Sequence, residues 1–336
     1  MNKDRLLWID VMKGLGITLV LMGHVSQNEL LTNWIFSFHM PMFFFISGIT
    51  FYISSKKSFI KKKAKTLLTP YFIFSILTLI YWIIIERNLR GDNTTIISQI
   101  TGLFLANGGL SNYVYNNVMW FLPCLLITEI IFYYFNKFDN KKLLRILCTS
   151  SLVGYVLPKL LDFRLPFTLD TMFMAILFYG IGYLFICNEK QLRIKKSLVI
   201  LICLLINIVS IYFNGRVDMN NNVYGNYILF IIGSLSGIAI IYIISKIYKF
   251  KFFSVIGKYS LIIMCIHEPI KRVLIKVISI ILKVDIDLAR QNVFIIFICT
   301  ILLLFITIPI AYIIDKYFGI LIGKKRKSNL QVLVHN

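Results

Sequence analysis

Long runs of apolar residues are the feature that most limits what this chain can fold into. Ten runs hold about 18 or more residues, the length that a helix needs to cross a bilayer, although the fifth is short and charges interrupt the ninth. They cover residues 8–26, 34–54, 66–85, 118–136, 143–158, 168–187, 196–213, 227–246, 254–282 and 291–320. Residues 96–106 are apolar but too few to span, and are expected at the interface. We predict an all-α polytopic membrane protein, a single domain over residues 1–336 forming one bundle of about ten transmembrane helices.

The composition excludes other classes of protein. Of the 336 residues, 58% are hydrophobic and 15% are charged, and the mean hydropathy is +0.79. Soluble domains have about 45–50% apolar and about 25% charged residues, so a soluble enzyme and a disordered chain are both excluded. The six cysteines lie singly in or beside apolar runs, without CxxC or metal-ligand spacing. They are predicted to be buried thiols, and no metal is expected.

The formal charge of +21 is expected to reflect membrane topology. Lys and Arg occur in short runs between the apolar segments, which is not the pattern of a nucleic-acid surface, so no nucleic-acid partner is expected. With the N-terminus inside, 25 of the 36 basic residues fall in cytoplasmic segments, in agreement with the positive-inside rule. We therefore predict that both termini are cytoplasmic and that the protein is a multi-pass protein of the cell membrane.

The first predicted helix carries three ionisable residues, Asp10, Lys13 and His24. Such residues inside membrane spans are costly and tend to be functional. Asp10 and Lys13 are three residues apart, so they can pair on one face. Lys13 and His24 are eleven apart, which places them on the same face about 16 Å apart along the axis. The alternative is a polar network that packs helices, with Lys13 extending to the inner membrane surface.

Two further histidines are expected near His24. His39 precedes Pro41, which suits a first helical turn, and lies in the outer part of the second predicted helix. His267 stands beside Glu268 in the ninth predicted helix, which runs outward. If that helix continues past Pro269, these two residues face a cavity, which we favour; if it ends there, they belong to a solvated outer loop. The fourth histidine, His335, is in the exposed tail.

Two residues of the predicted helix 118–136 have competing interpretations. Glu129 falls near the bilayer centre, where an unpaired carboxylate is costly. It either orients a histidine or an acceptor hydroxyl, or bonds to a neighbouring helix. Trp120 begins the same helix and either stacks on a sugar or anchors the helix at the membrane interface, where Trp is common.

Four motifs in order resemble those of the acyltransferase family 3 integral-membrane proteins. Asp10-x-x-Lys13-Gly14 followed by His24 resembles the basic-x10-His motif, with Lys where many members have Arg. Phe38-His39-Met40-Pro41 and Phe44-Phe45-Ile46-Ser47-Gly48 are similar to a signature of the fucose-4-O-acetylase-like branch. The later motifs are Trp120-Phe121-Leu122, and Gly257-Lys258-Tyr259-Ser260-Leu261 with Ile266-His267-Glu268-Pro269. The similarity extends over the whole chain, without the extracytoplasmic hydrolase-like domain that some members carry.

This resemblance implies a membrane O-acyltransferase that moves an acyl group, usually acetyl, from acetyl-CoA to a sugar hydroxyl of a cell-surface polysaccharide or lipid-linked saccharide. His24 is then the leading catalytic candidate, as a base or as a transient acyl carrier. His39, His267 and Glu129 are further catalytic candidates. Lys13 and Asp10 are candidates for binding the CoA donor, and Trp120 and Glu268 for binding the substrate. The alternative is an exporter or flippase of such saccharides, although we find none of the internal repeats that transporters often show.

Overall fold

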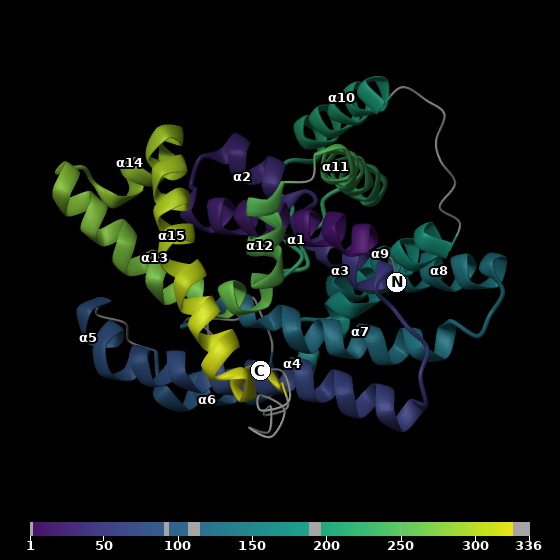
Figure 1. Cartoon of the computed structure of the whole chain (residues 1–336), viewed down its shortest axis with the longest axis horizontal. Coiled ribbons are helices and arrows are strands. Elements are labelled where there is room, and N and C mark those ends of the chain that lie inside the picture. Colours follow the sequence, from purple (N-terminus) through teal and green to yellow (C-terminus); the bar gives the residue numbers. More distant parts are fainter. Residues whose placement is uncertain (1–2, 91–93, 107–114, 188–195, 249, 325–336) are drawn as a thin grey trace, which may run out of the picture.

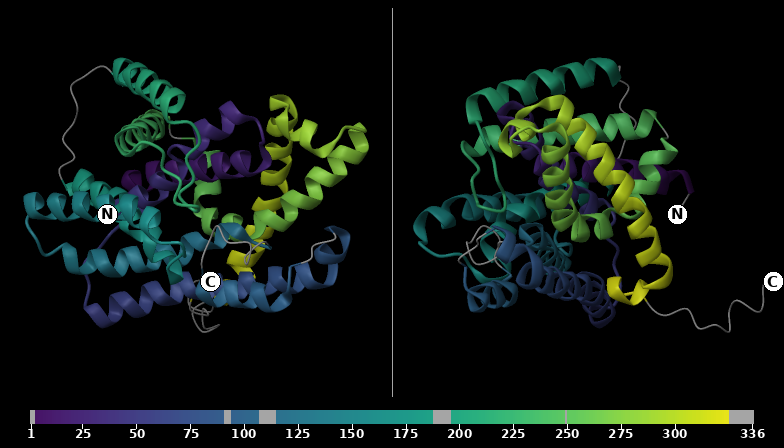
Figure 2. Two further views of the ribbon diagram at one scale, coloured as in Figure 1. Left: turned by 180° about the vertical axis from the view of Figure 1, so that it is seen from behind. Right: turned by 90° about the vertical axis from the view of Figure 1, so that its left-hand side faces the viewer.

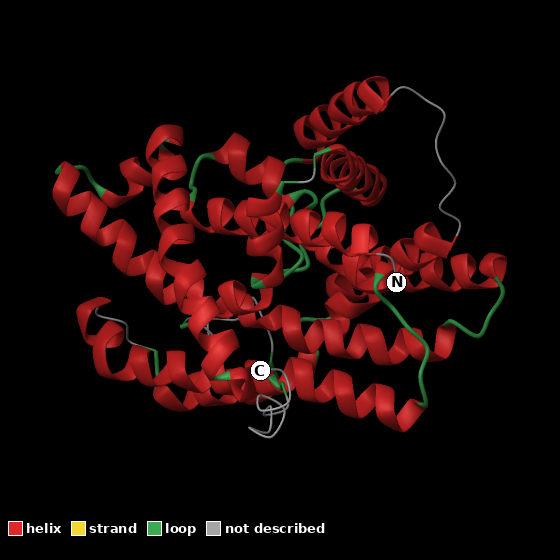
Figure 3. Cartoon of the chain, viewed as in Figure 1, coloured by secondary structure: helices red, strands yellow, loops and turns green. Residues whose placement is uncertain are grey.

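The computed structural model describes residues 3–90, 94–106, 115–187, 196–248 and 250–324, and this part of the chain is almost entirely helical (Figure 3). Its extended pairing is limited to the isolated bridge between Asp218 and Val223. The helices are α1 (Lys3–Val25), α2 (Glu29–Phe36), α3 (His39–Ile49), α4 (Lys56–Tyr81), α5 (Arg87–Arg90), α6 (Ile96–Leu105), α7 (Phe121–Phe135), α8 (Asn140–Leu160), α9 (Leu169–Cys187), α10 (Lys196–Asn214), α11 (Tyr227–Ile247), α12 (Lys251–Lys258), α13 (Ser260–Leu282), α14 (Ile286–Gln291) and α15 (Val293–Tyr317).

Nine helical segments in the described residues are long and apolar enough to cross a membrane. A tenth, α13, has 23 residues and the necessary length, but four charged residues interrupt its apolar sequence, at 268, 271, 272 and 276. The prediction of an all-α polytopic membrane protein is therefore confirmed. Ten crossings return the last helix to the side on which the first begins, and the distribution of basic residues predicts that this side is the cytoplasm. The short segment predicted at 96–106 is α6, with ten residues.

Helices α1 and α3 lie at the centre of the bundle (Figure 1), whereas four of the eight residues of α12 are exposed. Helix α1 packs most extensively against α12, α3 against α9, and α8 also against α9. Helix α10 lies at one edge, packed mainly on α11, and the two views of Figure 2 show it in the same outer position. Its outward face consists of large exposed apolar residues, among them Leu201, Leu205, Ile208 and Val209. In a membrane protein such a face meets lipid.

The predicted second span, 34–54, differs from the observed one. It begins earlier, at Glu29, and is divided into α2 and α3 by Ser37 and Phe38. The break agrees with Pro41, which has no backbone N–H to donate and lies in the first turn of α3, where the N–H groups need no helical partner. The carbonyl of Ser37 at the break accepts a hydrogen bond of 2.6 Å from the Ser234 hydroxyl of α11. Because lipid offers no such donors, a side chain must supply one.

Glycines allow two helix pairs to approach backbone to backbone. A Cβ atom built on Gly257 of α12 would lie 1.8 Å from the carbonyl oxygen of Asp10, and one on Gly14 would lie 1.9 Å from that of Phe253. Gly48 of α3 and Gly182 of α9 meet the opposite backbone in the same way. Small residues at helix crossings are the usual means of close packing in membranes. Both crossings involve helices that carry candidate site residues, so they set the spacing of the site.

Helix α13 continues through Pro269, which places its polar residues inside the bundle. A proline cannot donate to the carbonyl four residues earlier, here that of Cys265. The side-chain amide of the buried Asn116 donates a 3.2 Å hydrogen bond to that carbonyl. The helix therefore needs no break at this point. His267 and Glu268 are 0% and 5% exposed, so they do not belong to a solvated loop. They are buried in the bundle next to His24 but line neither of the two cavities described below, so the expectation that they face a cavity is not met.

Candidate functional site

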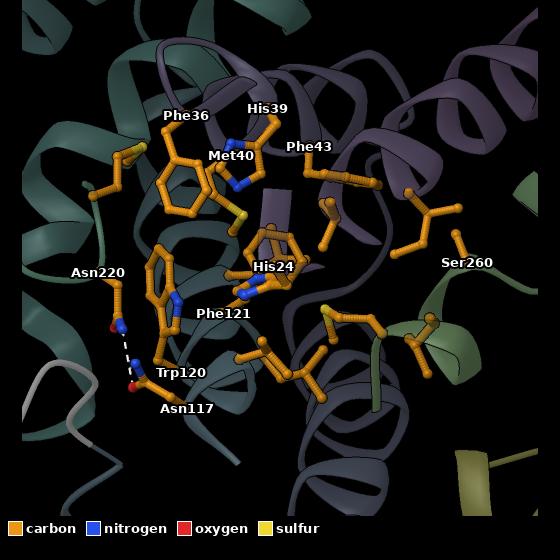
Figure 4. Close-up of a pocket in the computed structure, with 18 of the residues that line it drawn as sticks. His24, Phe36, His39, Met40, Phe43, Asn117, Trp120, Phe121, Asn220 and Ser260 are labelled. Atoms are coloured by element: carbon orange, nitrogen blue, oxygen red, sulfur yellow. Dashed lines mark hydrogen bonds between the residues drawn. The ribbon is translucent and has the colours of Figure 1, made fainter. Parts of the chain in front are cut away.

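An elongated cavity of about 370 Å³ follows one face of α1 through the bundle. Lys13 lines one end of it and His24 the other, three helical turns away or roughly 16 Å. Its walls come from α1, α2, α3, α7, α13 and the connection between α10 and α11. Figure 4 shows His24 in the middle of the outer part, with Phe36, His39 and Met40 on one side and Trp120 on another. The prediction that Lys13 and His24 share one face is confirmed.

His24 lies among aromatic and ionisable groups. Its ring centroid is 5.3 Å from that of His267 and 6.1 Å from that of Phe36. The carboxylate oxygen Oε1 of Glu268 lies 3.8 Å from Nδ1 of His24, too far for a hydrogen bond in this state. Catalytic hydrogen bonds are often long in the unliganded state and tighten once substrate is present. The side chain of His24 is 25% exposed, so one edge of the ring is accessible from the cavity.

His39 and His267 are held by backbone carbonyls of their own helices. Nδ1 of His39 lies 2.9 Å from the carbonyl oxygen of Ile35, and Nδ1 of His267 lies 2.9 Å from that of Met264. A carbonyl only accepts, so each Nδ1 carries the hydrogen and each neutral ring has its lone pair on Nε2. The buried Nε2 of His267 makes no hydrogen bond with any residue that the structure describes. Three of the four histidines therefore meet at one depth, as the sequence predicts.

Glu268 connects His24 to a chain of charges on α13. Nζ of Lys271 lies 2.5 Å from Oε2 of Glu268, and Nε of Arg272 lies 4.0 Å from the same oxygen. Arg272 in turn donates two hydrogen bonds of 2.8 Å to the carboxylate of Glu86, at the end of the α4 segment. Buried charges persist only when they are paired. This pairing keeps the carboxylate of Glu268 ionised and directed at Nδ1 of His24.

We predict that Glu268→Gln lowers kcat for acyl transfer by about ten- to a hundred-fold, because the uncharged amide no longer favours Nδ1–H on His24 or stabilises a positive imidazole. The KM values of donor and acceptor are expected to stay near those of the wild type. Glu268→Asp, which keeps the charge, is expected to restore part of kcat. The control is Asp315→Asn near the end of α15, whose partner Lys324 is outside the site. A fall in thermal stability without a specific loss of kcat would contradict this positioning role.

At the inner end, only one of the two residues that the sequence grouped together lines the cavity, although the two charges are close enough to interact electrostatically. Lys13 lines the cavity, but Asp10 does not and forms no ion pair with Lys13 within 4 Å. The region around Asp10 is instead in backbone contact with Gly257 of α12. Glu129 does not line the cavity, and the structure does not bring it to the histidines. Its carboxylate receives a 2.6 Å hydrogen bond from Lys63 of α4, so the interpretation as a bond to a neighbouring helix is the one confirmed.

The sequence model of acyltransferase family 3, described as an acyltransferase domain, matches residues 6–315. The chain belongs to this family. It is therefore a multi-pass membrane acyltransferase, as the motifs suggested. No curated protein and no solved structure gave a match.

In this acyltransferase, Trp120 lies in the wall of the cavity rather than on the lipid face. It is 4% exposed, at the end of the 3-10 turn Asn117–Trp120 that leads into α7. This position agrees with contact to a bound molecule and not with an anchor at the membrane interface. Asn117 in the same turn accepts a 3.0 Å hydrogen bond from the side-chain amide of Asn220 (Figure 4). Both asparagines also line the cavity.

A second cavity of about 510 Å³ also borders His24, and we call it the outer vestibule because the distribution of basic residues predicts that it faces the outside. It is lined by Gly23, His24, Ser26, Gln27, Glu29, Thr32, Asn33, Phe36, Arg216, Lys271 and Arg290. The two cavities share three lining residues, His24, Phe36 and Arg216. Sequence reasoning treated Arg216 only as one of the basic residues outside. The signal that it missed is the polar run around it in residues 214–222, which is unusual for a connection between two spans.

Proposed function

We propose that this acyltransferase transfers acetyl from acetyl-CoA to a hydroxyl of a cell-surface polysaccharide or lipid-linked saccharide in the cell membrane. The supporting observation is the position of His24 at the junction of two cavities, one extending inward to Lys13 and the other forming the outer vestibule. A donor from the cytoplasm and an acceptor from outside then meet at one imidazole. The similarity of the His39 motif to the fucose-4-O-acetylase-like branch supports acetyl as the acyl group and a sugar as the acceptor.

The inner end of the cavity suits the donor. Lys13 supplies a positive charge there, and Lys63 of α4 is close enough to influence it electrostatically. Lysine is a common point-charge partner of phosphate. Between Lys13 and His24 the wall is mostly apolar, with Ile17 and Val20 on α1, and this lining matches a thin chain better than a charged group. The donor supplies a thioester, whose carbonyl carbon is open to attack by an oxygen nucleophile.

At the outer end, His24 provides the proton transfer. With Nδ1 facing Glu268, Nε2 carries the lone pair and accepts the proton of the acceptor hydroxyl while the new C–O bond forms. The C–S bond breaks, and the proton passes from His24 to the thiolate that leaves. In the alternative mechanism, Nε2 attacks the thioester and carries the acyl group, which then passes to the acceptor hydroxyl. Trp120 offers a flat apolar face on which a sugar ring can stack.

We predict that Lys13→Gln raises KM for acetyl-CoA by about ten-fold, as expected for the loss of one charge-assisted contact, and changes kcat much less. Lys13→Arg is expected to keep the wild-type KM, because many family members carry Arg at this position of the motif. The measurement is the dependence of acetyl transfer on acetyl-CoA concentration. Lys61→Gln, an exposed residue of α4, is the matched control. An unchanged KM in Lys13→Gln would place the phosphates elsewhere.

The proposed function is tested with sealed vesicles that contain the full chain. Acetyl-CoA labelled in the acetyl group is supplied on the cytoplasmic face, and the glycan fraction is then examined for label, with His24→Ala vesicles as the matched control. Label in glycan that depends on His24 supports acyl transfer. Movement of unmodified glycan across the membrane without any transfer of label would instead support the exporter alternative.

A further inference from the structure

The outer vestibule is rich in positive charge. Arg216, Lys271 and Arg290 line it, against one carboxylate, that of the exposed Glu29. Glu268 lies next to it as the partner of Lys271, and Asp218 lines the neighbouring cavity, where it accepts hydrogen bonds from Asn221. The vestibule itself therefore has an excess of cations directly beside His24.

The three cations differ in what already neutralises them. Lys271 has its carboxylate partner in Glu268, 2.5 Å away. Arg290 donates from Nε to the carbonyl of Val25 at 3.0 Å and from Nη2 to that of His24 at 3.3 Å, and the carboxylates of Glu268 and Asp287 lie near enough to interact with it electrostatically. Its Nη1 makes no hydrogen bond with the described residues. Arg216 has no ion pair or hydrogen bond among the described residues, Glu29 included. Arg216 is thus an exposed cation without an anion among the described residues, and Arg290 has a guanidinium nitrogen, Nη1, whose two N–H groups donate to none of them.

The placement of Arg216 connects it to the reaction centre. Its guanidinium lies over the ring of Phe36, 5.6 Å from the centroid. Phe36 in turn contacts both His24 and His39, with centroid distances of 6.1 Å and 4.7 Å. Gly215, with a positive φ of 65°, forms the turn before Arg216, and the bridge from Asp218 to Val223 follows it. A group bound by Arg216 is therefore separated from the imidazole of His24 by one aromatic ring.

We propose that the outer vestibule binds an anionic group of the acceptor, a carboxylate or a phosphate, through Arg216, with Arg290 as the second ligand. This proposal rests on the proposed function, because it concerns the acceptor of the same reaction. Arginine presents several donors in a planar fork that fits both anions. The charge of Arg216 is expected to bind an acidic or phosphate-bearing saccharide more tightly than a neutral one. The bound anion then holds the acceptor beside His24.

Binding is measured first, without CoA, so that the result does not depend on catalysis. The purified full chain in lipid nanodiscs is titrated with methyl β-D-glucuronide, glucose 1-phosphate and methyl β-D-glucoside, and ligand-induced thermal stabilisation is recorded. We expect the wild type to bind at least one of the two anionic sugars about ten-fold or more tightly than the glucoside. Comparing the glucuronide with the 1-phosphate tells a carboxylate acceptor from a phosphate-bearing one.

Variants locate the binding to Arg216. Arg216→Gln is expected to remove the preference for the anionic sugar, and Arg216→Lys to keep part of it. Arg87→Gln is the matched control and is expected to bind as the wild type does, since Arg87 also lies over an aromatic ring, Trp82 at 5.7 Å, and lines neither cavity. Anionic probes that bind no better than the glucoside, or a preference that survives in Arg216→Gln, would overturn the proposal.

A transfer assay with the same three sugars separates this proposal from the proposed function. Preferential binding of an anionic sugar without any transfer of labelled acetyl would leave the anion site in place and refute the acyl transfer to sugars. Equal transfer of labelled acetyl to the glucoside and to the anionic sugars would support acyl transfer to sugars and refute the anion site. Preferential binding together with preferential transfer supports both.

Discussion

Replacing His24 with alanine is expected to lower acyl transfer by about a hundred- to ten-thousand-fold, the range typical of a lost general acid–base group. The expectation follows from the place of His24 at the junction of the two cavities and from its Nδ1 facing Glu268. It holds equally if His24 carries the acyl group. The measurement is the rate at which labelled acetyl moves from acetyl-CoA to glycan, with donor and acceptor both saturating.

Two further variants make the His24 result interpretable. His24→Gln keeps a polar side chain of similar length but cannot exchange a proton near neutral pH, so it is expected to be as inactive as His24→Ala. His335→Ala removes a histidine outside the described residues and is expected to keep wild-type transfer. Melting curves of the purified variants show whether they fold. A well-folded His24→Ala protein with full transfer would eliminate the mechanism.

We expect Gly257→Ala to lower the free energy of unfolding by about 2–3 kcal/mol, which corresponds to roughly 5 °C in Tm. A Cβ at this position would lie 1.8 Å from the carbonyl oxygen of Asp10 and 2.9 Å from the backbone nitrogen of Gly14. The nearest atoms belong to the backbone, so no side-chain rotation relieves the clash and α12 must move away from α1. Since Lys13 lies on α1 at this crossing, we also expect weaker binding of acetyl-CoA.

Gly319→Ala is the matched control for this prediction. A Cβ on Gly319 would lie 3.4 Å from the Cβ of Lys324, and its other neighbour within 4 Å belongs to the same side chain. Its Tm is expected to stay within about 1 °C of the wild type, since Gly319 is half-buried and the added methyl group makes only ordinary contacts with one flexible side chain, and such substitutions rarely exceed about 0.5 kcal/mol. Equal melting temperatures for the two glycine variants would show that the α1–α12 crossing tolerates separation.

The bundle could be predicted from the sequence because burial in lipid leaves a strong signal. Each span needs about 20 apolar residues, and the helical pitch then fixes which residues share a face, as it does for Lys13 and His24. Pro41 indicated a helix start near the interruption at Ser37, but the hydroxyl of α11 that bonds to the carbonyl of Ser37 comes from far away in the sequence and could not be predicted. The continuation of α13 past Pro269 likewise depends on Asn116, which no local pattern connects to Cys265.

The candidate site also contains residues that the sequence indicated and residues whose role depends on contacts between distant segments. His24, His39 and His267 were found because each is a rare polar residue inside an apolar run. Glu129 satisfies the same criterion, yet its charge is paired with that of Lys63, in the lysine run at the start of α4 that we had assigned to membrane topology. The sequence did not indicate Arg216 as a site residue, because it belongs to a connection between spans. The contacts of a loop residue depend on how the surrounding helices pack, which the sequence does not show.

The two cavities share the lining residues His24, Phe36 and Arg216, and this affects how well the membrane holds back protons and ions. These three side chains line both the space that reaches Lys13 and the outer vestibule, so they lie where the two cavities adjoin. A bilayer that stores an electrochemical gradient tolerates no continuous file of water across it. If donor and acceptor reach His24 from opposite sides, as we propose, these three side chains also lie on the path that water would take between the two sides, and their size then limits the leakage of protons and ions through this protein.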